Sequence, residues 1–198
     1  MLVTFDLVND CLKTISNSKM VSCDCETFGL NSFKSDSLFS IIVSCEEGDF
    51  YFNFKDYPEE NITALPLEVI TKLQIALENV PVVFGQNFKF DMHMLAREGL
   101  YIKGKIYDLM FLDRVHFNQH MSYRLKDITK RWGDEKLDIV WNYITENKLI
   151  DKIEHPDLGK TEERPRFDKV PFSIMQPYGE QDGRGTLNVG RKILAAIR

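Results

Sequence analysis

The stretch Val21–Leu30, VSCDCETFGL, decides how the rest of the sequence is interpreted. It begins like a buried strand, yet it carries Asp24 and Glu26 two positions apart. Because side chains alternate between the faces of a strand, both carboxylates should lie on one face. A lone carboxylate is very costly to bury, and one cation that bridges both would make the pair tolerable. Alone the pattern is weak evidence, since a D-x-E triplet arises by chance about once in a chain of this length.

The composition is typical of one globular domain. Of the 198 residues, 43% are hydrophobic and 28% are charged, so we expect a single domain, 1–198, with a substantial core. No apolar run approaches the roughly 18 residues of a membrane span. The N-terminus lacks the basic and apolar regions of a secretory signal. We therefore expect a cytoplasmic monomer without membrane contacts.

The net charge and the cysteines restrict the function classes. The net charge is −5, whereas tight sequence-independent binding to nucleic acid usually needs a basic surface. This weakens a nucleic-acid function without excluding it, because metal ions can hold a strand end. The four cysteines have the spacing of neither a zinc site nor a disulfide framework, so we expect them to be free and buried. They are Cys11, Cys23, Cys25 and Cys45.

The order of the predicted elements favours an α/β sheet covered by helices. The segment 150–171 is rich in charge and proline and is expected to be a long loop. Asp108 is expected to cap a helix from Leu109. The other expected strands are Met20–Glu26, Phe39–Ser44, Asp49–Phe54 and Val80–Gln86, and the other expected helices are Phe5–Ser16, Leu67–Leu77, Asp91–Gly99, Tyr123–Trp132, Leu137–Asn147 and Pro177–Ile197.

A second acidic position follows an apolar strand. In GQNFKFD (Gly85–Asp91), Asp91 lies at the carboxyl edge of that strand, where α/β sheets tend to bind ligands. The alternative is that Asp91 only caps the following helix.

A third acidic position lies near the C-terminus. In PYGEQD, Tyr178 and Asp182 are four residues apart and share one face of a helix. Tyr123 and Asp127 have the same spacing, so spacing alone does not choose between the two pairs.

Taken in order, D-C-E-T, N-F-K-F-D and Y-G-E-Q-D resemble the three motifs of the DEDD 3′–5′ exonucleases. Tyr178 fits the Tyr-type subclass, DEDDy; the His-type subclass would have His where this chain has Pro177. The nearest resemblance is to the proofreading domains of family A DNA polymerases, including phage ones. GQNFKFDMHML is similar to their second motif, and YDLM and SYRLKD are similar to the connecting segments. The resemblance therefore puts Tyr123 and Asp127 in a connector.

The resemblance implies a ribonuclease H-like mixed sheet flanked by helices, and two divalent cations, Mg²⁺ or Mn²⁺. It implies that Asp24 bridges both ions, that Glu26 and Asp182 complete the shell of the first, and that Asp91 holds the second. Tyr178 would orient the attacking water, because an ordinary phenol pKa near 10 makes a poor general base.

Further residues are candidates for substrate contacts. Thr27 and Asn87 would hold the terminal nucleotide, Leu30 would pack against its base, and Lys89 would reach a phosphate. Leu30 is equally well interpreted as a core residue. A basic run would follow the strand or form an ordinary solvated helix face; it comprises Arg124, Lys126, Lys130 and Arg131.

We therefore expect a 3′–5′ exonuclease that hydrolyses DNA, at single-stranded or frayed 3′ ends, to nucleoside 5′-monophosphates. It would serve proofreading or DNA degradation, with a DNA polymerase as a candidate partner. The alternatives are an exoribonuclease like ribonuclease D and a non-catalytic nucleic-acid-binding module. A length of 198 residues leaves no room for a polymerase, so the chain is either free-standing or a fragment of one; the initiating Met favours the former.

Glycines interrupt the third motif. Each costs about 1 kcal/mol in a helix interior, so we predict that this segment frays without metal and substrate. The glycines are Gly179, Gly183 and Gly185.

Overall fold

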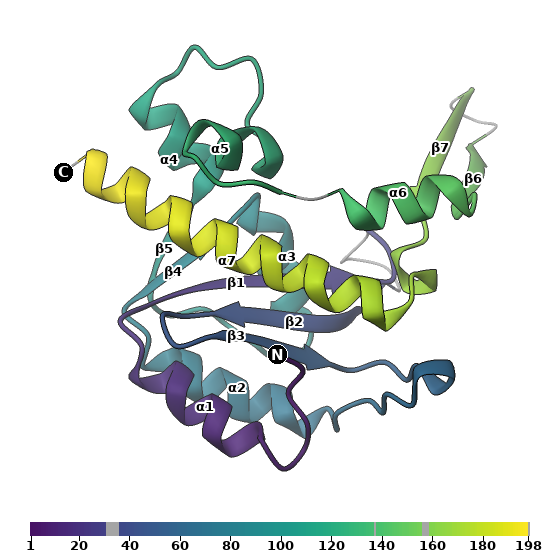
Figure 1. Ribbon diagram of the computed structural model, residues 1–198, viewed down its shortest axis with the longest axis horizontal. Helices are drawn as coiled ribbons and strands as arrows, with labels where there is room; N and C mark the ends of the chain where they lie inside the picture. The colour runs from purple at the N-terminus through teal and green to yellow at the C-terminus, as the bar shows by residue number, and fades with distance from the viewer. Residues whose placement is uncertain (31–35, 137, 156–158, 198) are drawn as a thin grey trace.

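The computed structural model describes residues 1–30, 36–136, 138–155 and 159–197 (Figure 1). Its centre is a five-stranded sheet of order β3-β2-β1-β4-β5. Strand β1 pairs antiparallel with β2 and parallel with β4, so the sheet is mixed. The elements are α1 (Val8–Asn17), β1 (Met20–Thr27), β2 (Leu38–Ser44), β3 (Asp49–Asn53), η1 (Pro58–Glu60), α2 (Glu68–Glu78), β4 (Val82–Gly85), α3 (Phe88–Arg97), β5 (Lys105–Asp108), α4 (Leu109–His116), α5 (Leu125–Arg131), α6 (Ile139–Glu146), β6 (Ile150–His155), β7 (Lys160–Pro165), η3 (Phe167–Lys169) and α7 (Phe172–Ala196).

Helices cover both faces of the sheet. One hydrophobic cluster joins α1, α2 and α3 to one face, and a second joins α4, α5 and α7 to the other. Because β2 lies between these layers, all seven of its residues are buried. All four cysteines are free and buried, as predicted. The predicted strands in the sheet and the Asp108 cap are also confirmed, the latter by a 2.9 Å bond from the Met110 amide to the Asp108 carboxylate.

Helix α7 lies unusually close to the sheet. The hydroxyl of Ser22 donates a 2.7 Å hydrogen bond to the carbonyl of Gly183. A Cβ at position 183 would lie 2.5 Å from the hydroxyl oxygen of Ser44 and 3.2 Å from Cγ2 of Ile42, so a side chain there would force these groups or the helix to move. The glycine thus has a packing role. The predicted fraying of this segment without metal and substrate stays a prediction, which hydrogen exchange on the metal-free protein can test.

The start of α7 differs from the prediction. The helix begins at Phe172, five residues before Pro177, which lies in its second turn and removes only one helical hydrogen bond. Glu60, from the 3₁₀ turn η1, caps the N-terminus of α7. Its carboxylate accepts bonds from the amides of Phe172, at 2.5 Å, and Ser173, at 2.9 Å.

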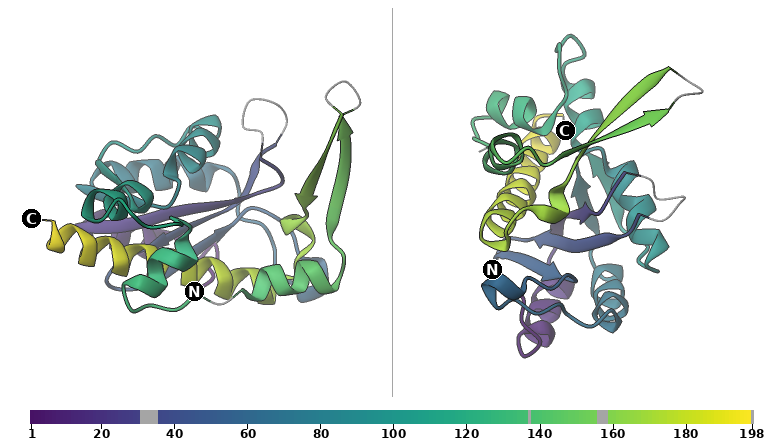
Figure 2. Two further views of the ribbon diagram at one scale, coloured as in Figure 1. Left: turned by 90° about the horizontal axis from the view of Figure 1, so that it is seen from above. Right: turned by 90° about the vertical axis from the view of Figure 1, so that its right-hand side faces the viewer.

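The expected long loop was wrong: the segment contains the antiparallel hairpin β6–β7. Figure 2 shows it projecting from the body of the protein. Cross-strand partners are mostly charged, as in Lys152 opposite Glu163, where the ammonium and carboxylate are 3.9 Å apart. Because both faces of the hairpin are largely exposed, its sequence has no apolar alternation. Strand β5, at the exposed edge of the sheet, was not predicted for the same reason. The predicted helix start at Leu137 lies outside the described residues.

Candidate active site

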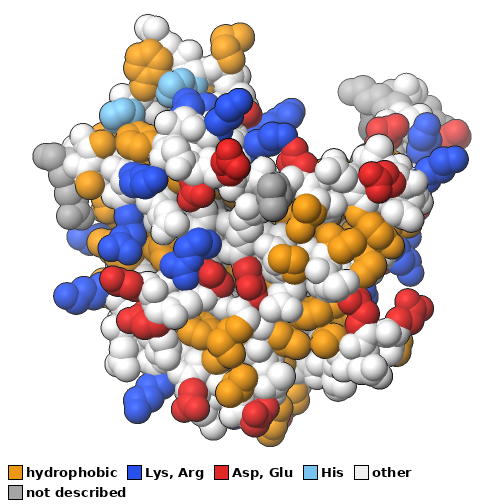
Figure 3. All heavy atoms as spheres, in the orientation of Figure 1, with side chains coloured by type: hydrophobic (Ala, Val, Ile, Leu, Met, Phe, Trp, Pro, Cys, Tyr) orange, Lys and Arg blue, Asp and Glu red, His pale blue; other side chains and the backbone are white. Residues whose placement is uncertain are grey.

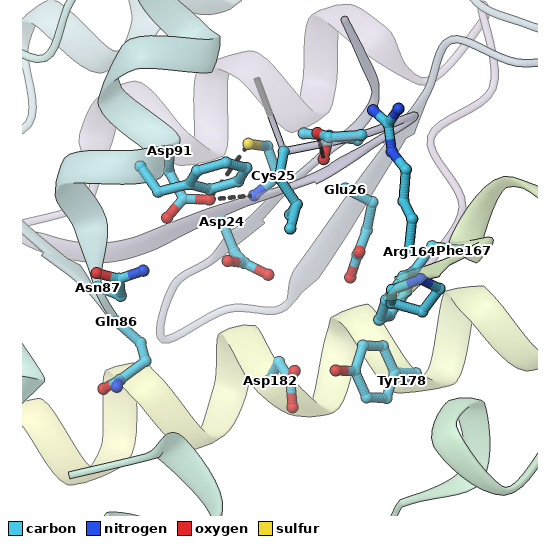
Figure 4. Close-up of a pocket in the computed structure, with 15 residues that line it drawn as sticks. Asp24, Cys25, Glu26, Gln86, Asn87, Asp91, Arg164, Phe167, Tyr178 and Asp182 are labelled. Atoms are coloured by element: carbon cyan, nitrogen blue, oxygen red, sulfur yellow. Dashed lines mark hydrogen bonds between the residues drawn. The ribbon is translucent and has the colours of Figure 1, made fainter. Parts of the chain in front are cut away.

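The residues of the three motifs meet at one cavity of about 220 Å³. It lies at the carboxyl end of β1 and is also bordered by the start of α3, by β7 and by α7 (Figure 4). The lining includes all five residues that the resemblance put at the site: Asp24, Glu26, Asp91, Tyr178 and Asp182.

The first two carboxylates owe their position to strand alternation. Asp24 and Glu26 face the cavity from β1, whereas the thiol of Cys25 between them points toward Asp91 (Figure 4). The Cys25 amide and thiol each donate a 3.2 Å bond to one oxygen of Asp91, which fixes that carboxylate beside the strand.

Asp91 is not the cap of α3. The helix begins at Phe88, so Asp91 lies inside its first turn. The amides of Asn87 and Phe88 instead donate to the carboxylate of Asp108, at 3.1 and 2.7 Å. The Asp91 side chain is therefore available to the cavity.

The third motif is joined to a residue that sequence analysis missed. The ammonium of Lys136 lies 2.5 Å from Oδ2 of Asp182 and 3.2 Å from the hydroxyl of Tyr178. It also lies 4.6 Å from the centre of the Tyr178 ring. Lys136 follows α5 in a polar segment without a motif, so the sequence offered no signal for it.

The competing Tyr–Asp pair lies elsewhere. The hydroxyl of Tyr123 donates to the carbonyl of Phe117, and the hydroxyl of Ser122 donates to Asp127. Neither Tyr123 nor Asp127 lines the cavity. Of the two Tyr–Asp pairs with the same sequence spacing, the structure therefore places Tyr178 and Asp182 at the cavity and the other pair away from it.

The site concentrates negative charge in a poorly hydrated place. Burial and then repulsion by the neighbouring carboxylates raise the pKa of Asp24 well above its usual range. Burial, followed by Asp182, raises the pKa of Glu26 to about 8, and burial raises that of Asp91 to about 7. Burial also raises the pKa of Asp182, although the ammonium of Lys136 opposes the shift.

The donor set fits a hard divalent cation. All four acidic side chains offer oxygen ligands, which Mg²⁺ and Mn²⁺ prefer. Oδ1 of Asp182 is buried and has no hydrogen-bond partner among the described residues, while Oδ2 is held by Lys136. Within the described ranges, no three acidic, His or Cys side chains are yet gathered closely enough to hold an ion.

Three of the four expected substrate contacts border the cavity. They are Thr27, Leu30 and Asn87. Leu30 is 63% exposed, which rules out its interpretation as a core residue. Lys89 is exposed and borders a separate hollow beside Phe111 and Val115. Its position gives no support to the expected phosphate contact.

Further lining residues come from the segment that was expected to be a loop, Pro165 among them. Arg164 on β7 and Phe167 in η3 border the cavity on the side of Glu26 and Tyr178 (Figure 4). Sequence analysis missed both because their placement depends on the hairpin.

The basic run near α5 does not form a continuous basic surface. Lys126 is paired with Asp138, and Arg131 is paired with Asp113. The face shown in Figure 3 carries acidic and basic side chains next to each other. Two of the four basic side chains are therefore committed to ion pairs within the protein.

Comparison with known proteins identifies the family. Residues 1–197 match the model of the family described as 3′-5′ exonuclease. The chain belongs to this 3′–5′ exonuclease family. The exonuclease is 23% identical over 177 residues to the DNA polymerase DpoZ of Salmonella phage PMBT28, a match that covers 88% of the chain and 26% of the polymerase. It is 28% identical over 195 residues to DNA polymerase I of Borreliella burgdorferi, covering 87% of the chain and 21% of that protein. The exonuclease thus spans about a quarter or less of these relatives.

The fold has solved counterparts. Trypanosoma brucei RNase D superposes with a TM-score of 0.65 at 15% identity, over 96% of this chain and 63% of that one. The predicted α/β, ribonuclease H-like mixed sheet flanked by helices is therefore confirmed. No helix among the described residues is both long and apolar enough to span a membrane.

Proposed function

We propose that this exonuclease removes nucleotides from the 3′ ends of DNA, at single-stranded or frayed termini, and releases nucleoside 5′-monophosphates. The observation that carries the proposal is the meeting of Asp24, Glu26, Asp91 and Asp182 at one cavity. They come from three segments far apart in the sequence, and packing alone does not explain why four carboxylates should share a poorly hydrated cavity.

The proposed cofactors are two ions of Mg²⁺ or Mn²⁺. When bound, such a pair supplies a nucleophilic water at neutral pH and stabilises the attacking and leaving oxygens of the phosphoryl displacement. Asp24 lies between the other carboxylates in the cavity and would be shared by both ions (Figure 4). Glu26 and Asp182 would hold the first ion, and Asp91 the second.

Tyr178 acts in this proposal as a hydrogen-bond donor. Burial, followed by the charges of Asp182 and Glu26, raises the pKa of its phenol far above the ordinary value. The phenol therefore stays protonated at any physiological pH and cannot serve as a general base. It positions a water at the edge of the carboxylate cluster, and Lys136, which contacts both Tyr178 and Asp182, keeps the two side chains together.

The rest of the cavity suits a strand end. Phe90, Phe167 and Leu30 offer apolar surface to the terminal base, and Thr27 and Asn87 add polar groups beside it. These contacts do not read a sequence, so we expect little preference for particular bases. The DNA polymerase relatives support DNA as the substrate, and a DNA polymerase is the proposed partner.

The deciding experiment is digestion of a 5′-labelled single-stranded DNA with Mg²⁺ or Mn²⁺. The proposal expects a ladder that shortens from the 3′ end and mononucleotide products. Asp182→Asn should abolish the ladder. Asp127→Asn is the matched control, because it removes the same charge from the other Tyr–Asp pair and should leave activity near that of the wild type. If the wild-type protein binds the oligomer but leaves it intact, the chain is instead a binding module.

RNA is the second candidate substrate, because the fold is shared with an RNase D. Matched DNA and RNA oligomers, digested in parallel, separate the two candidates. A protein distinguishes these strands through contacts to the 2′-hydroxyl. Faster hydrolysis of RNA would replace DNA in the proposal and leave the carboxylate site unchanged.

A further inference from the structure

The hairpin β6–β7 brings one basic side chain to the acidic cavity. Among the described residues that line the cavity, Arg164 is the only one with a positive charge. It lies on the side of Glu26 and Tyr178, across the cavity from Asp91 (Figure 4). A polyanionic strand that enters between carboxylates needs a cation besides the metal ions.

Arg164 is held in place by a specific contact. Its Nη2 forms an ion pair with the carboxylate of Asp36, and the two side chains are 25% and 14% exposed. The pair lies directly over Gly29, where any Cβ would overlap the guanidinium and the Asp36 carboxylate. The absence of a side chain at position 29 is thus a requirement of the Arg164 position.

The stability that the ion pair contributes does not account for the position of Arg164 at the cavity. A partly exposed pair contributes at most about 1 kcal/mol to folding. The guanidinium has five N–H donors in a planar fork, and the contact with Asp36 is made through Nη2. The fork also matches the geometry of a phosphate group.

We propose that Arg164 binds a backbone phosphate of the nucleic-acid strand next to the scissile position, and that this phosphate displaces Asp36 from the guanidinium. The inference rests on the proposed function, because it takes the cavity to be the site of strand hydrolysis. It assigns the hairpin a role in holding substrate. Asp36 keeps the arginine in its binding position while the cavity holds no strand.

Arg166 provides a matched control. It lies two residues further along, is paired with Asp151 and Asp168, and does not line the cavity. Changing it removes the same charge from the same region and also removes a link to β6. A general effect of charge or of hairpin stability would therefore appear in both variants.

The test measures equilibrium binding of a fluorescein-labelled single-stranded DNA as a function of KCl concentration. The Asp24→Ala background is used, because the proposed function predicts that it leaves the oligomer intact. Arg164→Gln should weaken binding about tenfold and reduce the slope of log K against log[KCl] by about 0.7, the value for one phosphate contact on a single strand. Arg166→Gln should change neither.

Two more variants keep the test decisive. Asp36→Asn removes the competitor and should tighten binding by about two- to fivefold. Arg164→Lys keeps the charge without the planar fork and should bind DNA more weakly than wild type with an unchanged salt slope. This variant replaces Arg164→Gln in the test if the circular dichroism of Arg164→Gln shows that it does not fold. The proposal is overturned if Arg164→Gln binds with wild-type affinity and slope, or if Arg166→Gln loses as much. Failure of the proposed function is separate: the Asp24→Ala protein would then still shorten the oligomer.

Discussion

Two parts of the cavity wall are built in opposite ways. The carboxylate side consists of β1, α3 and α7, of which β1 and α7 are packed so tightly that Gly183 contacts the sheet. The other part is the hairpin β6–β7, whose side chains are mostly exposed and which reaches the cavity through Arg164, beside Glu26 and Tyr178. The two parts of the wall meet different requirements. The groups that need fixed geometry are on buried elements, and a group that only needs to meet a flexible strand is on an exposed one.

The largest effect on stability is expected from filling the close contact of α7. Gly183→Val forces side-chain atoms into Ser44 and should push the helix from the sheet. We expect a loss of about 3 kcal/mol in the free energy of unfolding, measured by urea denaturation, together with loss of nuclease activity. A stable and active variant would show that the two layers are less tightly packed than the contact indicates. Gly159→Ala, in the exposed hairpin, is the comparison and should cost only about 1–2 kcal/mol, because the φ of 58° at this position disfavours a Cβ.

Lys136 tests whether the carboxylate side needs its internal cation. Lys136→Met leaves Oδ2 of Asp182 and the Tyr178 hydroxyl without their common donor. We expect kcat to fall about tenfold or more, the usual cost of losing a group that orients a metal ligand. Lys126→Met is the matched control, since Lys126 pairs with Asp138 away from the cavity. Equal activity in the two variants would remove Lys136 from the site.

The acidic cluster should make the metal-free protein sensitive to pH. The folded-state pKa values of Glu26, about 8, and Asp91, about 7, are raised above their ordinary values. The folded state therefore binds more protons than the unfolded chain, and stability falls as pH rises from about 4.5 to 8. Groups whose folded-state pKa is lowered, such as Asp168, lose their contribution to stability only at a pH below this range.

We expect the Tm in EDTA to drop by several degrees between pH 5 and pH 8, and Mg²⁺ to restore most of it at pH 8. Scanning calorimetry measures both effects. Glu26→Gln should flatten the pH dependence. A Tm in EDTA that rises over this range would contradict the charge state assigned to the cluster.

The smallest effect is expected on the hairpin. Lys152→Ala removes a cross-strand ion pair whose side chains are 69% and 65% exposed. Stability should change by less than about 0.5 kcal/mol, and strand binding should not change. A large effect on either would show that the hairpin surface contributes more than Arg164 alone.

The difference between the buried elements and the exposed hairpin explains which parts of the fold and of the site could be predicted from the sequence. Strand β1 was predicted because alternation puts Val21 and Cys23 in the core and Asp24 on the opposite face. The hairpin was not predicted, because two strands that are exposed on both faces do not need alternating apolar and polar residues. Lys136 and Arg164 were missed for a related reason. Each reaches the cavity from a segment whose own sequence has no motif, and only the tertiary structure brings it there.

The capping of α7 by Glu60 ties the site to a distant connection on the surface. The carboxylate that fixes the first turn of the helix belongs to the connection between β3 and α2, on the surface of the molecule. A rigid helix transmits a displacement of its first turn along its axis, and Tyr178 and Asp182 follow within three turns. Insertions or deletions in this connection should therefore alter turnover without changing any residue that lines the cavity.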